Sequence, residues 1–144
     1  TARIRMGVLY YYAAMKNYLV VGTSDKSELA IGYFTKYGDG GSDLLPLAGL
    51  YKTQLRELAK YLKVPPEIVE KKSSPRLWAE QLAEEELGMD YETLDPILYC
   101  LVDKRMKPAA AAKKLGASLE RVRRVQSMIE KNAHKRSMPP IARL

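Results

Sequence analysis

Hydrophobic positions follow two different spacings in the first third of the chain. Residues 18–21 form a short apolar, β-branched run without polar alternation, which is typical of a buried parallel strand. Residues 3–15 before it have no Pro and only one Gly, and predict a helix. After it, Ser24 and Asp25 can cap another helix with Glu28 in its first turns. This order of elements predicts an α/β fold with a doubly wound parallel sheet.

The rest of the chain shows mainly helical spacing. Residues 51–62 predict an amphipathic helix, and a short helix ending near residue 72 follows Pro65 and Pro66. The acidic run 84–86 is typical of a solvated helix face, and further helices are predicted at 91–102, 108–115 and 119 to about 133. Because one strand cannot form a sheet, we expect its partner strands in a part of the protein outside these 144 residues.

Composition narrows the class of protein. At 47% hydrophobic and 28% charged residues, the sequence is ordinary for a globular domain. No apolar run approaches the ~20 residues of a membrane span, and no signal peptide is visible. One cysteine, Cys100, allows no intrachain disulfide and favours a reducing, cytoplasmic compartment. With a single histidine besides, a structural zinc site is excluded, and we place Cys100 in the core.

The net charge of +7 is unevenly distributed. Residues 1–103 hold 12 Lys and Arg against 15 Asp and Glu, whereas residues 104–144 hold 12 against 2. Residues 108–125 also resemble a helix-turn-helix, with Gly116 in the turn and Arg121, Arg123 and Arg124 on the second helix. A nucleic-acid-binding module is therefore the alternative function. A solvated basic helix pair explains the same pattern, and a small DNA-binding module has no need of the first half of the chain.

Two polar loops could bind a nucleotide. Residues 22–28 (GTSDKSE) follow the predicted strand, where helix N-termini favour anions, and offer a hydroxyl at Thr23 and a carboxylate at Glu28. Residues 34–46 (FTKYGDGGSDLLP) combine glycines with Lys36 and Asp43, which suits phosphates and sugar hydroxyls. Taken singly, the first is also an ordinary capping turn and the second an ordinary surface turn. Lys52, Ser74 and the basic cluster at 134–136 are equally unremarkable alone.

Together these segments resemble the C-terminal portion of ammonia-dependent NAD synthetases, in the ATP-pyrophosphatase superfamily. The matching stretches are ARIRM (2–6), VGTSDKSE (21–28), FTKYGDGGSDLLP (34–46), LYKTQLR (50–56), SSPRLW (73–78), ELGMDY (86–91) and HKR (134–136). They occur in the family's order and cover nearly the whole chain. The resemblance implies a sheet of the adenine nucleotide α-hydrolase type, of which this chain holds the C-terminal, mostly helical part. Residues 1–75 then carry the strand and ligand loops, and residues 76–144 a helical region of the same domain.

The resemblance also implies roles for individual residues. Thr23, Lys52 and Ser74 correspond to ATP-binding positions, and Glu28 to a Mg²⁺ ligand. The positions that hold deamido-NAD (nicotinic acid adenine dinucleotide) correspond to Arg3, Lys36, Asp43, His134 and Lys135. We expect an ATP-dependent amidation of deamido-NAD by ammonia through an adenylated intermediate, in a homodimer. We see no covalent nucleophile.

Two departures from the family limit this expectation. Residues 80–84 read EQLAE where the family usually has GQTDE, which puts any role of that loop in doubt. The Ser-Gly-Gly-x-Asp-Ser pyrophosphate loop, which lies well upstream in the family, is not in these 144 residues. We therefore expect the 144 residues alone to be inactive. We also expect free ammonia as the amide donor, unless a glutaminase domain lies outside these 144 residues.

Overall fold

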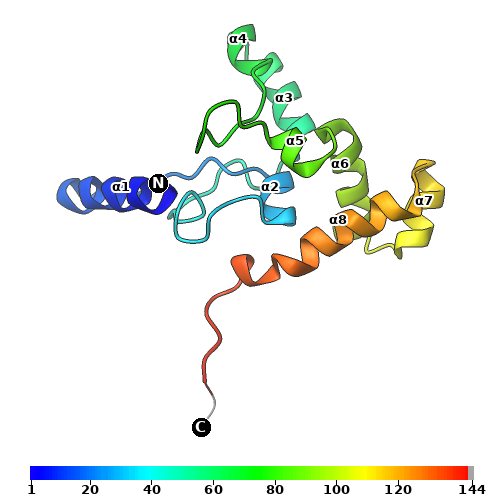
Figure 1. Ribbon diagram of the computed structural model, residues 1–144. Helices are drawn as coiled ribbons and strands as arrows, with labels where there is room; N and C mark the ends of the chain where they lie inside the picture. The colour runs from blue at the N-terminus through cyan, green and yellow to red at the C-terminus, as the bar shows by residue number, and fades with distance from the viewer. Residues whose placement is uncertain (143–144) are drawn as a thin grey trace.

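The computed structural model describes residues 1–142, in which the regular elements are helices joined by long loops (Figure 1). The first half contains α1 (Ala2–Lys16), α2 (Lys26–Ile31), α3 (Lys52–Tyr61) and the short α4 (Pro66–Val69) and α5 (Ala83–Leu87). The second half contains α6 (Tyr91–Leu98), the π-helical turn η1 (Tyr99–Asp103), α7 (Pro108–Leu115), α8 (Leu119–Lys131) and the 3₁₀ turn η2 (Ala133–Arg136). The predicted succession of helices is confirmed, with end positions shifted by a few residues.

Local capping explains where several of these helices begin and end. At α2 the Asp25 carboxylate accepts from the Glu28 N–H at 2.9 Å, and the Glu28 carboxylate accepts from the Asp25 N–H at 3.2 Å. This reciprocal pair is a capping box. Asp90 caps α6 and Ser118 caps α8 with a single bond, each side chain accepting one backbone N–H. Gly32 ends α2 in the left-handed conformation that glycine adopts without strain.

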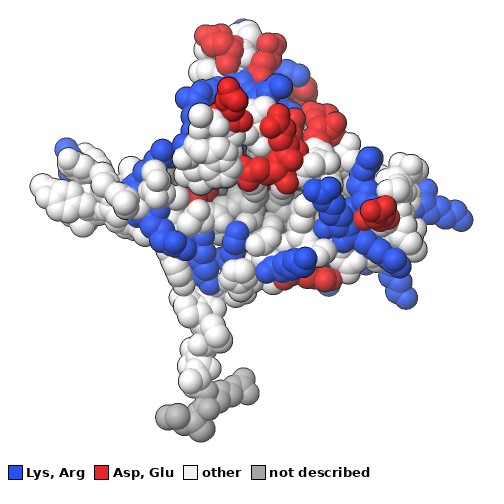
Figure 2. Space-filling model, in the orientation of Figure 1, with Lys and Arg blue, Asp and Glu red and all other residues white. Residues whose placement is uncertain are grey.

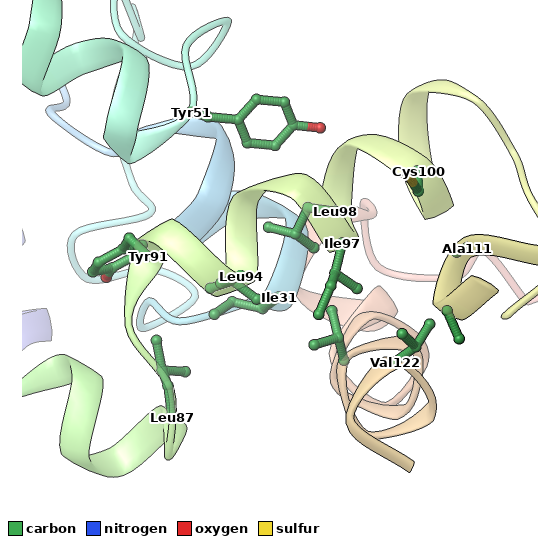
Figure 3. Packing of buried hydrophobic residues seen from close by; sticks show 12 residues of the cluster. Ile31, Tyr51, Leu87, Tyr91, Leu94, Ile97, Leu98, Cys100, Ala111 and Val122 are labelled. Carbon is green, nitrogen blue, oxygen red and sulfur yellow. The ribbon is translucent and has the colours of Figure 1, made fainter. Parts of the chain in front are cut away.

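The core forms around α6 (Figure 3). Leu94, Ile97 and Leu98 of α6 are almost completely buried, as are Val122 and Val125 of α8. Cys100, in η1, is buried in the same cluster as expected. Tyr91, the first residue of α6, is buried too, and the other buried members come from α2, α5, α7 and the start of α3: Ile31, Tyr51, Leu87, Ala111 and Ala112. The second half of the chain and α2 thereby form one packed body.

Residues 18–21, predicted as a buried parallel strand whose partners lie outside these 144 residues, are extended and only partly covered. In the described residues the pairing of extended segments is one parallel bridge, between Val21 and Leu44. Val20 is buried, but Leu19 and Val21 are 71% and 55% exposed. The run is extended and contacts residues 34–46, the glycine loop, on one side, with the Gly22 N–H donating to the Leu44 carbonyl at 2.8 Å. An apolar run alone does not determine whether both of its faces are covered.

Helix α1 lies apart from the other helices, at the left of Figure 1. Its residues contact the glycine loop rather than another helix; the Tyr10 hydroxyl, for example, donates to Asp43 Oδ1 at 3.1 Å. Many of its large apolar side chains are exposed: Ile4, Val8, Leu9, Tyr11, Tyr12 and Met15. Among residues 1–142 there is no helix of the length and apolarity that a membrane span needs.

Candidate functional site

Two of the predicted site residues meet in one charged cluster. Lys52, the first residue of α3, places its ammonium 2.8 Å from Glu28 Oε1 and 2.5 Å from Asp25 Oδ2. The Asp25 side chain is fully buried, whereas the side chains of Lys52 and Glu28 remain 15% and 21% exposed. The N-terminus of α2 and that of α3 are thus joined through a single lysine.

This cluster has more negative than positive charge. Burial raises the pKa of Glu28, and the nearby Asp25 carboxylate raises it further, so that Lys52 does not offset the two effects. Burial lowers the pKa of Lys52, but Glu28 and Asp25 outweigh it, and the net pKa is raised. Lys52 therefore stays protonated. Because two carboxylates share one ammonium, the site favours the approach of a further cation.

The backbone of Lys52 is also held by side chains from other helices. The Lys52 N–H donates to Ser27 Oγ at 2.9 Å, and Ser27 donates to Asp95 Oδ1 at 2.5 Å. The second Asp95 oxygen accepts from the Thr53 N–H at 2.9 Å. Ser27 and Asp95 are both buried. Nothing in the sequence indicated Ser27 or Asp95, because their partners are distant along the chain.

A cavity of about 540 Å³ lies between the start of α1, the glycine loop and the segment before α5. The predicted residues Thr23 and Lys135 line it. The Lys135 ammonium donates to the carbonyls of Gly32 and Phe34, at 2.7 and 3.0 Å, and lies 5.7 Å from the Phe34 ring centroid. Other lining residues include Arg5, Met6, Gly22, Tyr33, Thr35, Gly38, Gly41, Trp78 and Gln81.

The glycine loop and the C-terminal basic segment, residues 134–136, are joined by hydrogen bonds in both directions. Lys36 donates to the carbonyls of His134 and Ser137, at 2.6 and 2.7 Å, while Lys135 reaches back to the loop as described. Arg136 donates to the carbonyls of Leu29 and Ala30 near the end of α2. The His134 ring is exposed and its Nδ1 lies 3.1 Å from the Lys131 carbonyl. The structure thereby places Lys36, His134 and Lys135 near one another.

Asp43 stabilises the crossing of the glycine loop over residues 18–22. Its Oδ2 accepts from the Val20 N–H at 2.8 Å and its N–H donates to the Val20 carbonyl at 2.9 Å. The Tyr10 hydroxyl, on α1, occupies its other oxygen. Asp43 is exposed, so that its carboxylate remains accessible to a ligand while these bonds fix its position.

Two predicted residues stand apart from these clusters. Arg3 is exposed on the first turn of α1, and it is Arg5 of this helix that lines the cavity. Ser74 accepts from the Arg76 N–H at 3.1 Å within its own loop, and its neighbour Pro75 lines the cavity. The structure does not bring Arg3 or Ser74 into contact with Lys52 or Lys36.

Gln81, Glu86 and Tyr33 add polar groups to the cavity, from the segment before α5, from α5 and from just after α2. Gln81 is buried, donates to Glu86 Oε1 at 2.6 Å, and accepts from the Leu77 N–H at 2.9 Å. Burial and the nearby Glu86 charge raise the pKa of Tyr33 to about 12, so that this hydroxyl keeps its proton. These three side chains line one wall of the cavity. The departure from the family's usual sequence at residues 80–84 therefore lies beside the cavity.

Comparison with known protein families identifies the family of this chain. Residues 1–139 match the family model described as NAD synthase. The chain belongs to the NAD synthase family. Relatives in this family include the NH₃-dependent NAD⁺ synthetase of Hyperthermus butylicus, 58% identical over 96% of this chain and 50% of its own length. That of Staphylothermus marinus is 52% identical over 99% of this chain and 52% of its own.

Solved structures give the same family. The NMN synthetase from Francisella tularensis superposes with a TM-score of 0.81 at 36% identity, covering 99% of this chain and 54% of that one. The NH₃-dependent NAD synthetase from Campylobacter jejuni gives a TM-score of 0.71 at 35% identity, over 99% and 53%. The chain thus spans about half the length of the NAD synthase family members that it matches.

The basic helix pair is present, and one of its arginines packs against a neighbouring helix end. Lys and Arg side chains gather over α7 and α8, and acidic side chains gather near α3 to α5 (Figure 2). Val122 and Val125 face the core, and a Cβ atom at Gly88 would stand 2.6 Å from Arg124 Nη2. Arg124 thus packs against the end of α5. These comparisons give no support to the nucleic-acid-binding alternative.

Proposed function

We propose that this chain is the part of an ammonia-dependent NAD synthetase that holds the phosphates of ATP and binds deamido-NAD. The observation that carries the proposal is the Lys52–Glu28–Asp25 cluster in a chain that belongs to the NAD synthase family. The proposal includes the doubly wound parallel sheet, to which residues 18–22 and 43–44 would contribute through their parallel bridge. It also includes a cytoplasmic location.

The proposed reaction has two steps. A carboxylate oxygen of deamido-NAD attacks the α-phosphorus of ATP, and the bond to the β-phosphate oxygen breaks to release pyrophosphate. Ammonia then attacks the carbonyl carbon of the adenylate, loses a proton, and AMP departs with the bonding electrons. The protein's contribution is to position the reactants and to neutralise the charge that grows on the leaving pyrophosphate.

In this proposal Lys52, Thr23 and Ser74 contact ATP. Lys52 fits because its ammonium is held at a fixed place, stays protonated, and remains 15% exposed. Thr23 lines the neighbouring cavity with an exposed side chain. Ser74 belongs to the loop whose next residue, Pro75, lines that cavity. An ammonium suits a phosphate as a compact point charge.

Glu28 is proposed to bind Mg²⁺ together with the ATP phosphates. The residues fit such an ion, because Glu28 is part-exposed, its pKa is raised, and the cluster has one carboxylate more than it has ammonium groups. No group of three or more candidate ligands exists among the described residues, so that phosphates, water and other protein groups would complete the coordination. Mg²⁺, when bound, would neutralise phosphate charge during the reaction.

The 540 Å³ cavity and its rim are proposed to bind deamido-NAD. Lys135 lines the cavity. Lys36 and His134 lie next to it, where the glycine loop is hydrogen-bonded to the C-terminal basic residues. Asp43 offers a fixed carboxylate for sugar hydroxyls, and Arg3 a further cation on α1. For Lys36 and Lys135 to contact the dinucleotide, they would exchange the carbonyls that they bind for ligand oxygens.

A homodimer is part of the same proposal. The exposed apolar face of α1 supports it, since side chains such as Tyr11 and Met15 are more than 60% exposed. Packing against another part of the full-length protein would cover the same face. Equilibrium sedimentation of that protein at micromolar concentration should give twice the monomer mass, and a clean monomer would contradict the dimer.

A second substrate deserves a parallel assay. The superposition on an NMN synthetase is better than that on the NH₃-dependent NAD synthetase, with TM-scores of 0.81 and 0.71. The corresponding substrate would be nicotinic acid mononucleotide, which lacks the adenylate half of deamido-NAD. A cavity that binds the whole dinucleotide should favour deamido-NAD.

The test uses the full-length protein with ATP, Mg²⁺ and ammonium, and either deamido-NAD or the mononucleotide. We expect NAD, AMP and pyrophosphate in equal amounts, and a higher kcat/KM for deamido-NAD. A higher kcat/KM for the mononucleotide would favour the second candidate. If no AMP forms with either substrate, both candidates are refuted. The 144 residues alone should form no product, and turnover at the full-length rate would overturn that expectation.

A further inference from the structure

The N-terminus of α3 is capped by side chains from two other helices. The residue before it, Tyr51, donates its own N–H to Gln54 Oε1, and its side chain does not cap the helix. The N–H of Lys52 is instead accepted by Ser27 of α2, and the N–H of Thr53 by Asp95 of α6. Two segments distant in sequence, α2 and α6, therefore converge on the first turn of α3.

The same first turn carries the lysine proposed to meet ATP. The side chain of Lys52 is held by Asp25 and Glu28, while its backbone is held by Ser27, which belongs to the same turn of α2. Ser27 in turn is fixed by Asp95 through a 2.5 Å hydrogen bond. Asp95 is thus the outermost member of a chain of contacts that ends at Lys52.

Asp95 is costly as a mere structural residue. It is 4% exposed, and burial raises its pKa. Its two oxygens bond to a hydroxyl and a backbone N–H, both neutral groups. A buried carboxylate without a cation is unfavourable, and a helix can be capped at lower cost by a Ser or Thr directly before it. The arrangement instead gives a rigid anchor to the segment that presents Lys52.

We infer that Asp95 is a positioning residue, which acts through Ser27 and the first turn of α3 to fix Lys52 for the ATP phosphates. This inference rests on the proposed function. Both oxygens of Asp95 must accept, whereas an Asn side chain has only one accepting oxygen, so that Ser27 or the Thr53 N–H loses its present bond. Asp95→Asn preserves the size of the side chain and disturbs only this anchor.

Two variants of the full-length protein test this inference. Asp95→Asn changes the anchor itself, and Ser27→Ala is a milder change in the same chain of contacts. Each should lower kcat/KM for ATP by about tenfold or more, as expected for loss of a hydrogen bond to a charged group. The KM for deamido-NAD should change less than about twofold, because the cavity does not include Asp95. Val125→Ala, a buried change in α8, is the control for lost stability.

Lys52→Ala and the double variant Lys52→Ala with Asp95→Asn complete the experiment. If Asp95 acts through Lys52, the second change should have no further effect on kcat/KM for ATP once Lys52 is gone. Additive losses would overturn the positioning role, and so would equal losses for Val125→Ala. If Lys52→Ala itself leaves kcat/KM for ATP unchanged, the assignment of Lys52 fails, and the inference with it. Should Asp95→Asn not fold, Ser27→Ala in the same cycle decides.

Discussion

Lys52 Nζ lies 2.8 Å from Glu28 Oε1, so that the proposed phosphate-binding lysine and the proposed metal ligand are paired with each other. Asp25 shares the same ammonium from the buried side. Without ligands this pairing satisfies Lys52 and part of the acidic charge. With ATP and Mg²⁺, the two residues would separate onto partners of opposite charge, Lys52 to phosphate and Glu28 to metal. The ion pair would then keep both groups in place before the ligands arrive.

Glu28→Gln should therefore impair catalysis and the use of Mg²⁺. In the full-length protein we expect kcat to fall on the order of 10²-fold, because a metal ligand and a partner of Lys52 are lost together. The concentration of Mg²⁺ needed for half-maximal rate should rise. Glu57→Gln, on the exposed face of α3, is the matched control and should do neither. A normal kcat with an unchanged Mg²⁺ requirement would refute the metal role.

The basic residues proposed to bind deamido-NAD give a second prediction. Lys135→Ala should raise the KM for deamido-NAD, because it removes both a cation at the cavity and the contact with the carbonyls of Gly32 and Phe34. His134→Ala should raise it as well. Replacing Arg121, Arg123 and Arg124 with Gln should leave this KM nearly unchanged. Steady-state kinetics with varied deamido-NAD provide the measurement, and a larger effect of the arginine changes would contradict the proposed site.

The same arginine triple variant tests the nucleic-acid alternative. If the three residues contacted DNA phosphates, duplex affinity would fall with salt at a log–log slope of about −0.9 per contact, and the triple change would abolish it. We expect no such binding, because Arg124 packs on Gly88 and the family is one of synthetases. Sub-micromolar, salt-sensitive binding that the triple change removes would show that the basic helices have a nucleic-acid partner.

Local signals made much of the helical structure predictable. The cap at Asp25, the apolar spacing of 51–62 and the valines at 122 and 125 each depend on residues within a few positions of one another. The exposure of residues 19 and 21 was not predictable, since it depends on which segments lie alongside. Asp95 was invisible for the same reason, because its partners Ser27 and Thr53 are 68 and 42 residues away. The contact of Lys36 with the His134 carbonyl joins residues 98 positions apart, which no local pattern indicates.

Helix capping at α6 predicts a pH-dependent loss of stability. Hydrogen bonds from Thr93 lower the pKa of Asp90 below its usual value. The stabilisation is therefore present above the ordinary aspartate pKa and is lost as the pH falls through the lowered folded-state value. Asp90→Ala should reduce the free energy of unfolding by about 1 kcal/mol at neutral pH. Urea unfolding at several pH values measures this, and the difference from the unmodified protein should shrink at acid pH. A constant difference would contradict the role of the ionised cap.

The last prediction concerns two glycines that end helices in the same conformation. Gly32 has φ +72° and Gly116 has φ +62°, so that alanine is strained by a similar amount at both. A Cβ at Gly32 would stand 2.2 Å from Asn132 Cβ, whereas none of the described atoms lies within 4 Å of one at Gly116. Gly116→Ala should cost about 1 kcal/mol, the strain alone.

Gly32→Ala should cost clearly more, because Asn132 must also move and its hydrogen bond to the Ile31 carbonyl is lost. The displaced turn also adjoins the Gly32 carbonyl that Lys135 binds, so that the KM for deamido-NAD should rise in this variant and not in Gly116→Ala. Urea unfolding and steady-state kinetics of both variants give the comparison. Equal unfolding free energies for Gly32→Ala and Gly116→Ala would show that the end of α8 does not pack against the end of α2 as closely as the structure indicates.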